Sequence, residues 1–217
     1  MDPQFELIIS KFKMQSEPLE FYQKIKQCLL DYSSLAQGAQ QEQLVHQRLE
    51  ELRIIEVLKA YKPLVVGTFP IACSTLKSDV DIICYAQDPS QFVKEFQGII
   101  KHHQPFSLLE EVQYLQPSEE RSSSLIRFSY KQLPFEIFCD CIDSKSQNGF
   151  RHMLIEKILL ELFPESREPI VAMKLAGIKT EPAFARYFKL VPSNQDSHSY
   201  LRLLSLLEEL EGLLAQL

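Results

Sequence analysis

Hydrophobic residues change their spacing twice along the chain, and this change constrains the fold more than any other feature. In the first sixty residues, apolar side chains recur every three or four positions, as at Val45, Leu49, Leu52 and Ile55, which predicts amphipathic helices. Pro63 ends this zone, and short apolar runs with a period of two follow it. From Gln147 onward the helical spacing returns. We therefore expect helices, then a mixed sheet, then a helical tail.

The expected elements follow from these periods and from the prolines and glycines between them. Strands are expected over 64–66, 79–84, 107–115, 124–130 and 134–142. Helices are expected from Pro18 to near Gly38, over 88–101 after Asp88-Pro89, and over 148–163, 166–177, 181–188 and 197–215. This order predicts an α+β protein. Residues 1–145 would form a sheet domain with N-terminal helices, and residues 146–217 a helical bundle packed on it.

Composition excludes several classes of protein. The 217 residues are 45% hydrophobic and 24% charged, which is typical of a globular domain and not of a disordered one. The net charge of −6 argues against nucleic acid as a partner, because phosphate contacts need clustered Lys and Arg. No apolar run approaches the roughly 20 residues that span a bilayer, and the N-terminus does not resemble a signal peptide. We expect a cytoplasmic protein without a membrane segment.

The five cysteines are expected to be free thiols. Their number is odd, and most of them lie in apolar or strand-like stretches, which is typical of buried thiols and not of a disulfide framework. Cys139-Asp140-Cys141 lacks the two-residue spacing of a structural zinc site.

Asp79 and Asp81 are the first candidates for a functional site. Residues two apart in a strand project from the same face, so both carboxylates point one way while Val80 and Ile82 point the other. Two like charges on one face repel unless a cation lies between them, and Mg²⁺ or Mn²⁺ takes carboxylate oxygens. The alternative is an edge strand whose two acids are simply solvated.

A glycine turn and a second acidic strand complete this constellation. Gly67 lets the backbone approach a phosphate closely, and Thr68 can donate its hydroxyl and amide to phosphate oxygens; alternatively, the pair is a plain turn. Glu136 lies on the face opposite its apolar neighbours, which makes it a third carboxylate or an outward-facing glutamate. Asp140 shares its face and is the substitute if the register differs.

Four segments together resemble a known superfamily. They are Val66–Ile71, Ser78–Cys84, Gln147–Met153 and Lys174–Ala185, within residues 60–190. The first two are similar to the core signature of the nucleotidyltransferase superfamily, the polymerase-beta-like fold. All four resemble a bacterial family within it that has been classified only as a domain of unknown function.

This resemblance implies phosphoryl transfer assisted by two metal ions. Asp79 and Asp81 would bind the metals, with Glu136 as third ligand and general base. The turn at Gly67 and Thr68 would hold the β- and γ-phosphates of a nucleoside triphosphate. An acceptor hydroxyl would attack the α-phosphorus in line, and pyrophosphate would leave.

The sequence departs from the superfamily pattern at two places. Gly-Thr replaces the more usual Gly-Ser, and the loop Ala72–Lys77 contains no glycine. Neither departure removes a metal ligand, but both bear on how tightly a nucleotide binds.

Further residues could contact the nucleotide phosphates. Ser78 and Lys77 adjoin the acidic strand, Arg151 opens a helix where its charge needs an anionic partner, and Lys179 belongs to the last of the four segments. Lys179 could instead lie on a solvated helix face.

His152 and Glu181 have two interpretations each. His152 could carry a proton or serve only in packing. Lys174 and Glu181 could line the cleft or lie on a solvated helix face.

The sequence therefore predicts a Mg²⁺-dependent nucleotidyltransferase that transfers a nucleoside monophosphate to a small-molecule or protein hydroxyl. The alternative is a non-catalytic sensor or protein-interaction module of the same fold, such as a toxin–antitoxin partner. A metal-dependent phosphoesterase is a third hypothesis, disfavoured because no histidine lies beside the acidic strand. The last helix carries more leucine than one apolar stripe needs, so it is buried on two sides or contacts a protein partner or a second copy.

Overall fold

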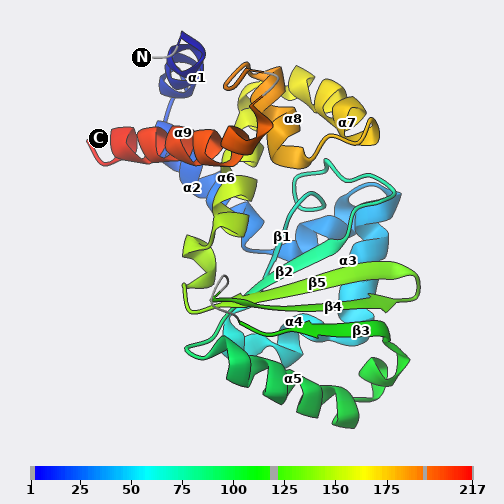
Figure 1. The fold of residues 1–217 in the computed structure, drawn as a ribbon. Coiled ribbons are helices and arrows are strands. Elements are labelled where there is room, and N and C mark those ends of the chain that lie inside the picture. Colours follow the sequence, from blue (N-terminus) through cyan, green and yellow to red (C-terminus); the bar gives the residue numbers. More distant parts are fainter. Residues whose placement is uncertain (1–2, 118–121, 193–194, 217) are drawn as a thin grey trace. The chain divides into compact units, whose positions relative to one another are not determined.

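The chain folds into helices and a five-stranded sheet, as seen in a computed structural model that describes residues 3–117, 122–192 and 195–216 (Figure 1). The strand order is β1-β2-β5-β4-β3, with β2 parallel to β5 and the other neighbours antiparallel. The strands are β1 (Leu64–Val66), β2 (Val80–Tyr85), β3 (Glu110–Leu115), β4 (Ser124–Tyr130) and β5 (Leu133–Asp140). The expected α+β class with a mixed sheet is confirmed.

The α-helices occupy the two ends of the chain and the β2–β3 connection. They are α1 (Pro3–Lys13), α2 (Pro18–Leu29), α3 (Gln40–Leu52), α4 (Ile54–Val57), α5 (Pro89–His102), α6 (Asn148–Leu162), α7 (Arg167–Leu175), α8 (Thr180–Tyr187) and α9 (Ser199–Leu214). Short 3₁₀ turns are η1 (Tyr32–Gln37), η2 (Lys59–Tyr61), η3 (Gln104–Leu108), η4 (Ser144–Ser146), η5 (Pro164–Ser166) and η6 (Asp196–His198). Within the described ranges, each helix is too short or too polar to cross a membrane.

Contacts divide the chain into two units. The sheet unit comprises residues 32–72 and 76–150, and the helical unit comprises residues 1–31, 73–75 and 151–217. This division differs from the expected boundary at 145, because the first 31 residues group with the C-terminal helices. The apolar face of α1 explains the difference: Phe5 is buried, and the Arg202 guanidinium of α9 stacks 3.9 Å above its ring. The Tyr22 hydroxyl of α2 likewise donates a hydrogen bond to Glu211 of α9.

One face of the sheet forms the core of the sheet unit. Alternate residues of the three central strands are buried on it, and α3, α4 and α5 supply apolar side chains to the same core. These strand residues are Val80, Ile82 and Cys84 of β2, Ile126, Phe128 and Tyr130 of β4, and Phe135, Ile137 and Cys139 of β5. This apolar set fixes the register of the strands, since a slip of one residue would expose all of them.

The opposite face of the sheet carries the polar residues of the same strands. On it, Asp81, Glu136 and Asp140 are half-buried. Ile83 is buried there because the first turn of α6 lies against it: a Cβ on Gly149 would sit 3.4 Å from its Cγ2. The face is therefore covered at one end and accessible at the acidic residues.

Two details of the N-terminal helices differ from the prediction. The helix that begins at Pro18 ends at Leu29 instead of near Gly38, and a 3₁₀ turn follows. Asp31 and the serines after it are residue types that hydrogen-bond nearby backbone and so compete with helix formation. After α3, the left-handed backbone of Arg53 (φ 50°) shifts the helical phase, so Ile54 is fully buried in place of the expected Ile55.

The helical unit is built around leucine-rich α-helices. From Arg151 to its end, α6 is buried on nearly every side, as expected for a helix that is apolar all round. The excess leucine of α9 is largely accounted for by burial within this unit, although Leu201 is exposed.

All five cysteines are free thiols, as expected. Cys73, Cys84 and Cys139 are buried, and burial raises the pKa of Cys73 to about 11 and that of Cys139 to about 12. Cys28 and Cys141 are exposed. The three buried thiols are therefore packing residues and not nucleophiles.

The start of α5 provides a test of the local fold. The Asp88 carboxylate accepts hydrogen bonds from the backbone N–H groups of Ser90 (2.8 Å) and Gln91 (3.2 Å). Asp88→Ala should lower the free energy of unfolding in urea by about 0.5–2 kcal/mol, because these N–H groups lose their acceptor. Asp88→Asn keeps an acceptor oxygen and should lose little. Equal stability of the alanine variant and the wild type would contradict the capping role.

Candidate functional site

Two parallel strands bring the predicted carboxylates together. In the pairing of β2 with β5, Asp81 lies opposite Glu136. Asp79 directly precedes β2, which begins at Val80 and not at Asp79 as expected, and its carboxylate still lies near those of Asp81 and Glu136. Asp140 lies opposite Tyr85, further along the strands. The structure therefore favours Glu136 over the substitute Asp140 as the third carboxylate.

These three side chains form an acidic cluster. One carboxylate oxygen from each of Asp79, Asp81 and Glu136 lies within 4.8 Å of the others. All three residues are half-buried, so the cluster is shielded by protein on one side and reached by solvent on the other. A set of oxygen donors with open positions fits a hard divalent cation such as Mg²⁺, which keeps several of its waters.

Arg127 was missed by the sequence analysis, and it lies directly beside the cluster. It pairs with Glu136 across the antiparallel β4–β5 ladder, and its Nε donates to Glu136 Oε1 at 2.6 Å. Both side chains are partly exposed, at 47% and 29%. The alternation of β4 could have placed Arg127 on the outer face, but its pairing with Glu136 depends on strand order, which the local pattern does not contain.

The glycine turn after β1 touches the cluster. Val66 pairs with Asp81, and Gly67 follows with φ +81°, a backbone conformation that favours glycine. A Cβ on Gly67 would lie 2.3 Å from Oδ2 of Asp81, so the turn leaves room for the carboxylate only because it has no side chain.

The other predicted residues of the sheet unit adjoin this turn. The Thr68 hydroxyl donates to the Ser78 hydroxyl at 3.3 Å, which links the turn to the residue before Asp79. Ser78 is half-buried, and Lys77 is exposed. The predicted phosphate-contacting groups at 67, 68 and 78 therefore lie close to the acidic cluster in one unit.

Two predicted nucleotide contacts belong to the helical unit. Arg151 already has an anionic partner, since its Nη2 lies 3.0 Å from Oε1 of Glu208. This carboxylate explains why an arginine is tolerated in the first turn of α6. Lys179 is exposed and directly precedes α8. Their roles in nucleotide binding stay predictions.

Gly67 offers a direct test of this geometry. Gly67→Ala should lower the free energy of unfolding by about 1–3 kcal/mol, because it combines a strained backbone with a clash against Asp81. Gly98→Ala is the matched control, since nothing lies within 4 Å of a Cβ there; in the middle of α5 it should be neutral or stabilise by up to about 1 kcal/mol. Urea unfolding measures both. If both variants matched the wild type, the close approach of Asp81 to Gly67 would be wrong.

The fold resembles several solved structures at low identity. It is similar to the GLD-2/RNP-8 complex, with a TM-score of 0.47 and 12% identity over 83% of this chain and 70% of that chain. It is also similar to the non-canonical poly(A) polymerase complex GLD-2–GLD-3, with a TM-score of 0.45 and 12% identity over 80% of this chain and 50% of that one. The similarity to mtPAP in complex with ATPγS has a TM-score of 0.47 and 13% identity, over 87% of this chain and 40% of that chain. The chain thus spans half or less of the length of the last two.

Comparison by sequence places the chain in a family. No curated protein matches it significantly. The model of one family, described as a domain of unknown function (DUF4269), matches residues 47–206, which include β1, the acidic cluster and α6 to α8. The chain therefore belongs to the DUF4269 family.

Proposed function

We propose that this protein binds a nucleoside triphosphate together with Mg²⁺ or Mn²⁺ and transfers the nucleoside monophosphate to an acceptor hydroxyl. The observation that carries the proposal is the acidic cluster. Three carboxylates, one on β5, one on β2 and one directly before β2, converge on one partly exposed spot, beside a glycine turn that leaves room for one of them. The resemblance of the two sequence segments to the nucleotidyltransferase signature supports the same reading.

Asp79, Asp81 and Glu136 would hold the metal. A bound divalent cation would supply positive charge to phosphate oxygens and lower the barrier to displacement at phosphorus. The donors fit this task because all are carboxylate oxygens and because the half-buried face leaves positions for water and phosphate. The carboxylates would orient the ion beside the turn at Gly67.

The turn would bind the terminal phosphates. Gly67 lets the main chain approach a phosphate, and the Thr68 hydroxyl, now bonded to Ser78, can turn to donate to a phosphate oxygen. Lys77 is exposed close by in sequence and can add a positive charge. Arg151 and Lys179 remain candidates for further phosphate contacts.

The transfer step moves one nucleotidyl group, the nucleoside monophosphate. The acceptor oxygen forms a bond to the α-phosphorus, the bond from that phosphorus to the bridging oxygen breaks, and pyrophosphate leaves with the electron pair. Glu136 would take the proton of the acceptor hydroxyl. Arg127 holds Oε1 of Glu136 from the side and so fixes the direction in which its carboxylate faces.

The acceptor is proposed to be a hydroxyl of a small molecule or of a protein. The net charge of −6 disfavours a long nucleic acid, whose binding depends on many Lys and Arg contacts.

Calorimetry with ATP, GTP, CTP and UTP in the presence of Mg²⁺ tests the proposal. We expect at least one triphosphate to bind in a metal-dependent way. The double variant Asp79→Asn/Asp81→Asn should weaken this binding by ~100-fold or more, because loss of even an outer-shell partner of a metal costs about 10–100-fold.

Asp140→Asn is the matched control for that experiment. It removes one negative charge from the same face of β5 but leaves the cluster intact, so it should change the affinity less than about twofold. If no triphosphate binds the wild type, the enzyme reading fails and the non-catalytic interaction module takes its place.

The Arg127–Glu136 ion pair predicts that Arg127 and a metal ion compete for the Glu136 carboxylate. In the absence of nucleotide, Arg127→Gln should tighten Mn²⁺ binding about two- to fivefold, since a partly exposed ion pair contributes ~0.2–1 kcal/mol and its loss frees a ligand oxygen. Electron paramagnetic resonance of free Mn²⁺ measures the affinity.

Lys131→Gln controls for the change in net charge. Lys131 is an exposed cation between β4 and β5 that pairs with Glu51 at 2.8 Å. Its removal should leave Mn²⁺ binding nearly unchanged. Equal effects of the two variants would mean that Arg127 acts through general charge and does not compete for Glu136.

A further inference from the structure

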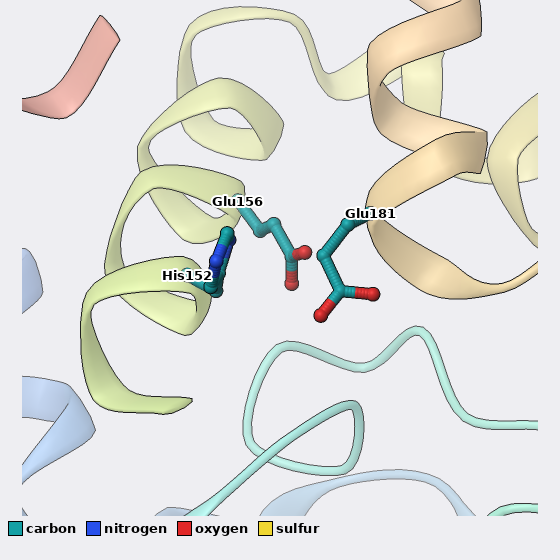
Figure 2. A group of neighbouring side chains, drawn as sticks. All are labelled: His152, Glu156 and Glu181. Atoms are coloured by element: carbon teal, nitrogen blue, oxygen red, sulfur yellow. The ribbon is translucent and has the colours of Figure 1, made fainter. Parts of the chain in front are cut away.

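A second cluster of potential metal ligands lies within the helical unit. His152 and Glu156 are four residues apart on α6, so they project from the same side of the helix, and Glu181 stands in the first turn of α8. Figure 2 shows the carboxylates of Glu156 and Glu181 pointing toward one another, with the His152 ring beside them. One donor atom from each residue lies within 4.8 Å of the other two.

Two of these side chains are buried without hydrogen-bond partners. His152 is 6% exposed and Glu156 is 3% exposed. Nδ1 of His152 and Oε1 of Glu156 are buried, and neither atom has a hydrogen-bond partner among the residues that the structure describes. Buried polar atoms are nearly always paired, and an unpaired buried charge is strongly unfavourable, so these atoms need a partner that protein groups do not supply.

Burial is the main cause of the pKa shifts of these three side chains. Burial, and then the negative charge of Glu181, raise the pKa of Glu156 well above its usual value, although the nearby Lys174 opposes this. Burial also raises the pKa of Glu181, against the opposing effects of its own backbone, Lys179 and Lys174. Burial and then Arg151 lower the pKa of His152 to about 4.

We propose that His152, Glu156 and Glu181 bind one divalent transition-metal cation, such as Zn²⁺ or Mn²⁺. A dication would neutralise the two carboxylates and would give the unpaired nitrogen and oxygen a partner. One imidazole nitrogen with two carboxylate oxygens is a donor set that suits first-row transition metals, whereas Mg²⁺ prefers oxygen alone. This site is separate from the acidic cluster and does not depend on nucleotidyl transfer.

The geometry requires only small side-chain rotations. Ligand atoms about 2.0–2.2 Å from a zinc ion stand about 3.5 Å apart in a tetrahedral site. The present separations of up to 4.8 Å can close by about 1 Å of movement. Glu181 is half-buried, so an ion can enter from its side and keep a water molecule as a further ligand.

The competing explanation is a carboxyl pair that shares a proton. In that case Glu156 is a neutral acid that faces Glu181, the cluster serves only in packing, and no metal binds.

A Co²⁺ titration of the Asp79→Asn/Asp81→Asn variant separates these explanations. This background removes two ligands of the acidic cluster, so metal uptake there cannot be mistaken for uptake by the second site. We expect one Co²⁺ per chain, with visible d–d absorption of nitrogen and oxygen ligands and without thiolate charge-transfer bands. We also expect the thermal midpoint to rise with Co²⁺ concentration, since the ion binds the native state.

Ligand substitutions then assign the site. Glu156→Gln and Glu181→Gln, each added to that background, should weaken Co²⁺ binding ~100-fold or more. Glutamine has the shape of the neutral acid, so Glu156→Gln should keep the fold, and Glu181→Gln provides a second variant at a half-exposed position. Glu161→Gln is the matched control: Glu161 lies on the same helix, is exposed, and pairs with Lys157 at 2.8 Å away from the cluster.

Three results would overturn the proposal. They are no Co²⁺ uptake by the background variant, uptake that both glutamine substitutions leave unchanged, and thiolate charge-transfer bands, which would assign the ion to cysteine. Failure of nucleotide binding at the acidic cluster would leave this titration unaffected, so the two proposals can fail separately.

Discussion

The parallel pairing of β2 with β5 is the constraint on which the candidate site depends. It puts Asp81 directly opposite Glu136, and the buried residues on the other face hold that register. A slip by one residue would move the acids into the apolar core and expose the core residues, so burial of Val80 and Ile137 indirectly positions the carboxylates. The chemistry of the polar face is therefore specified by the packing of the apolar one.

The acidic cluster is a local concentration of like charge. The carboxylate oxygens lie within 4.8 Å of one another, and two unit charges at that limit repel by about 1 kcal/mol in water and by about 3–4 kcal/mol at an effective dielectric constant of 20. Arg127 offsets part of this repulsion through Glu136, but the three carboxylates still exceed one guanidinium in charge. The remaining negative potential favours binding of a cation. Because the cluster is only half-buried, that cation can keep water or phosphate oxygens as further ligands.

Much of this arrangement was predictable because it rests on local alternation. The period of two located β2, β4 and β5 within a residue or two and put Glu136 on the correct face. What could not be predicted depends on contacts distant in sequence. The ion pair of Arg127 with Glu136 follows from the order of the strands in the sheet. The grouping of α1 with α9 follows from which apolar helix faces pack together. The phase shift at Arg53 was missed because a left-handed residue leaves no mark in the apolar spacing.

The surroundings of Glu156 likewise could not be predicted from the local sequence pattern. In the sequence Glu156 stands between Ile155 and Lys157, on a helix that is buried almost all round, so a spacing argument does not mark it as buried. Only the approach of α8 gives it a neighbour in Glu181 and turns an isolated buried acid into part of a cluster with His152. The two clusters differ by one imidazole and by burial. Oxygen donors on an accessible sheet face suit a hard ion that arrives with phosphate, whereas a buried set that includes a neutral histidine suits a transition metal held by the protein alone. Donor type and burial, more than the number of acids, therefore distinguish what each cluster can bind.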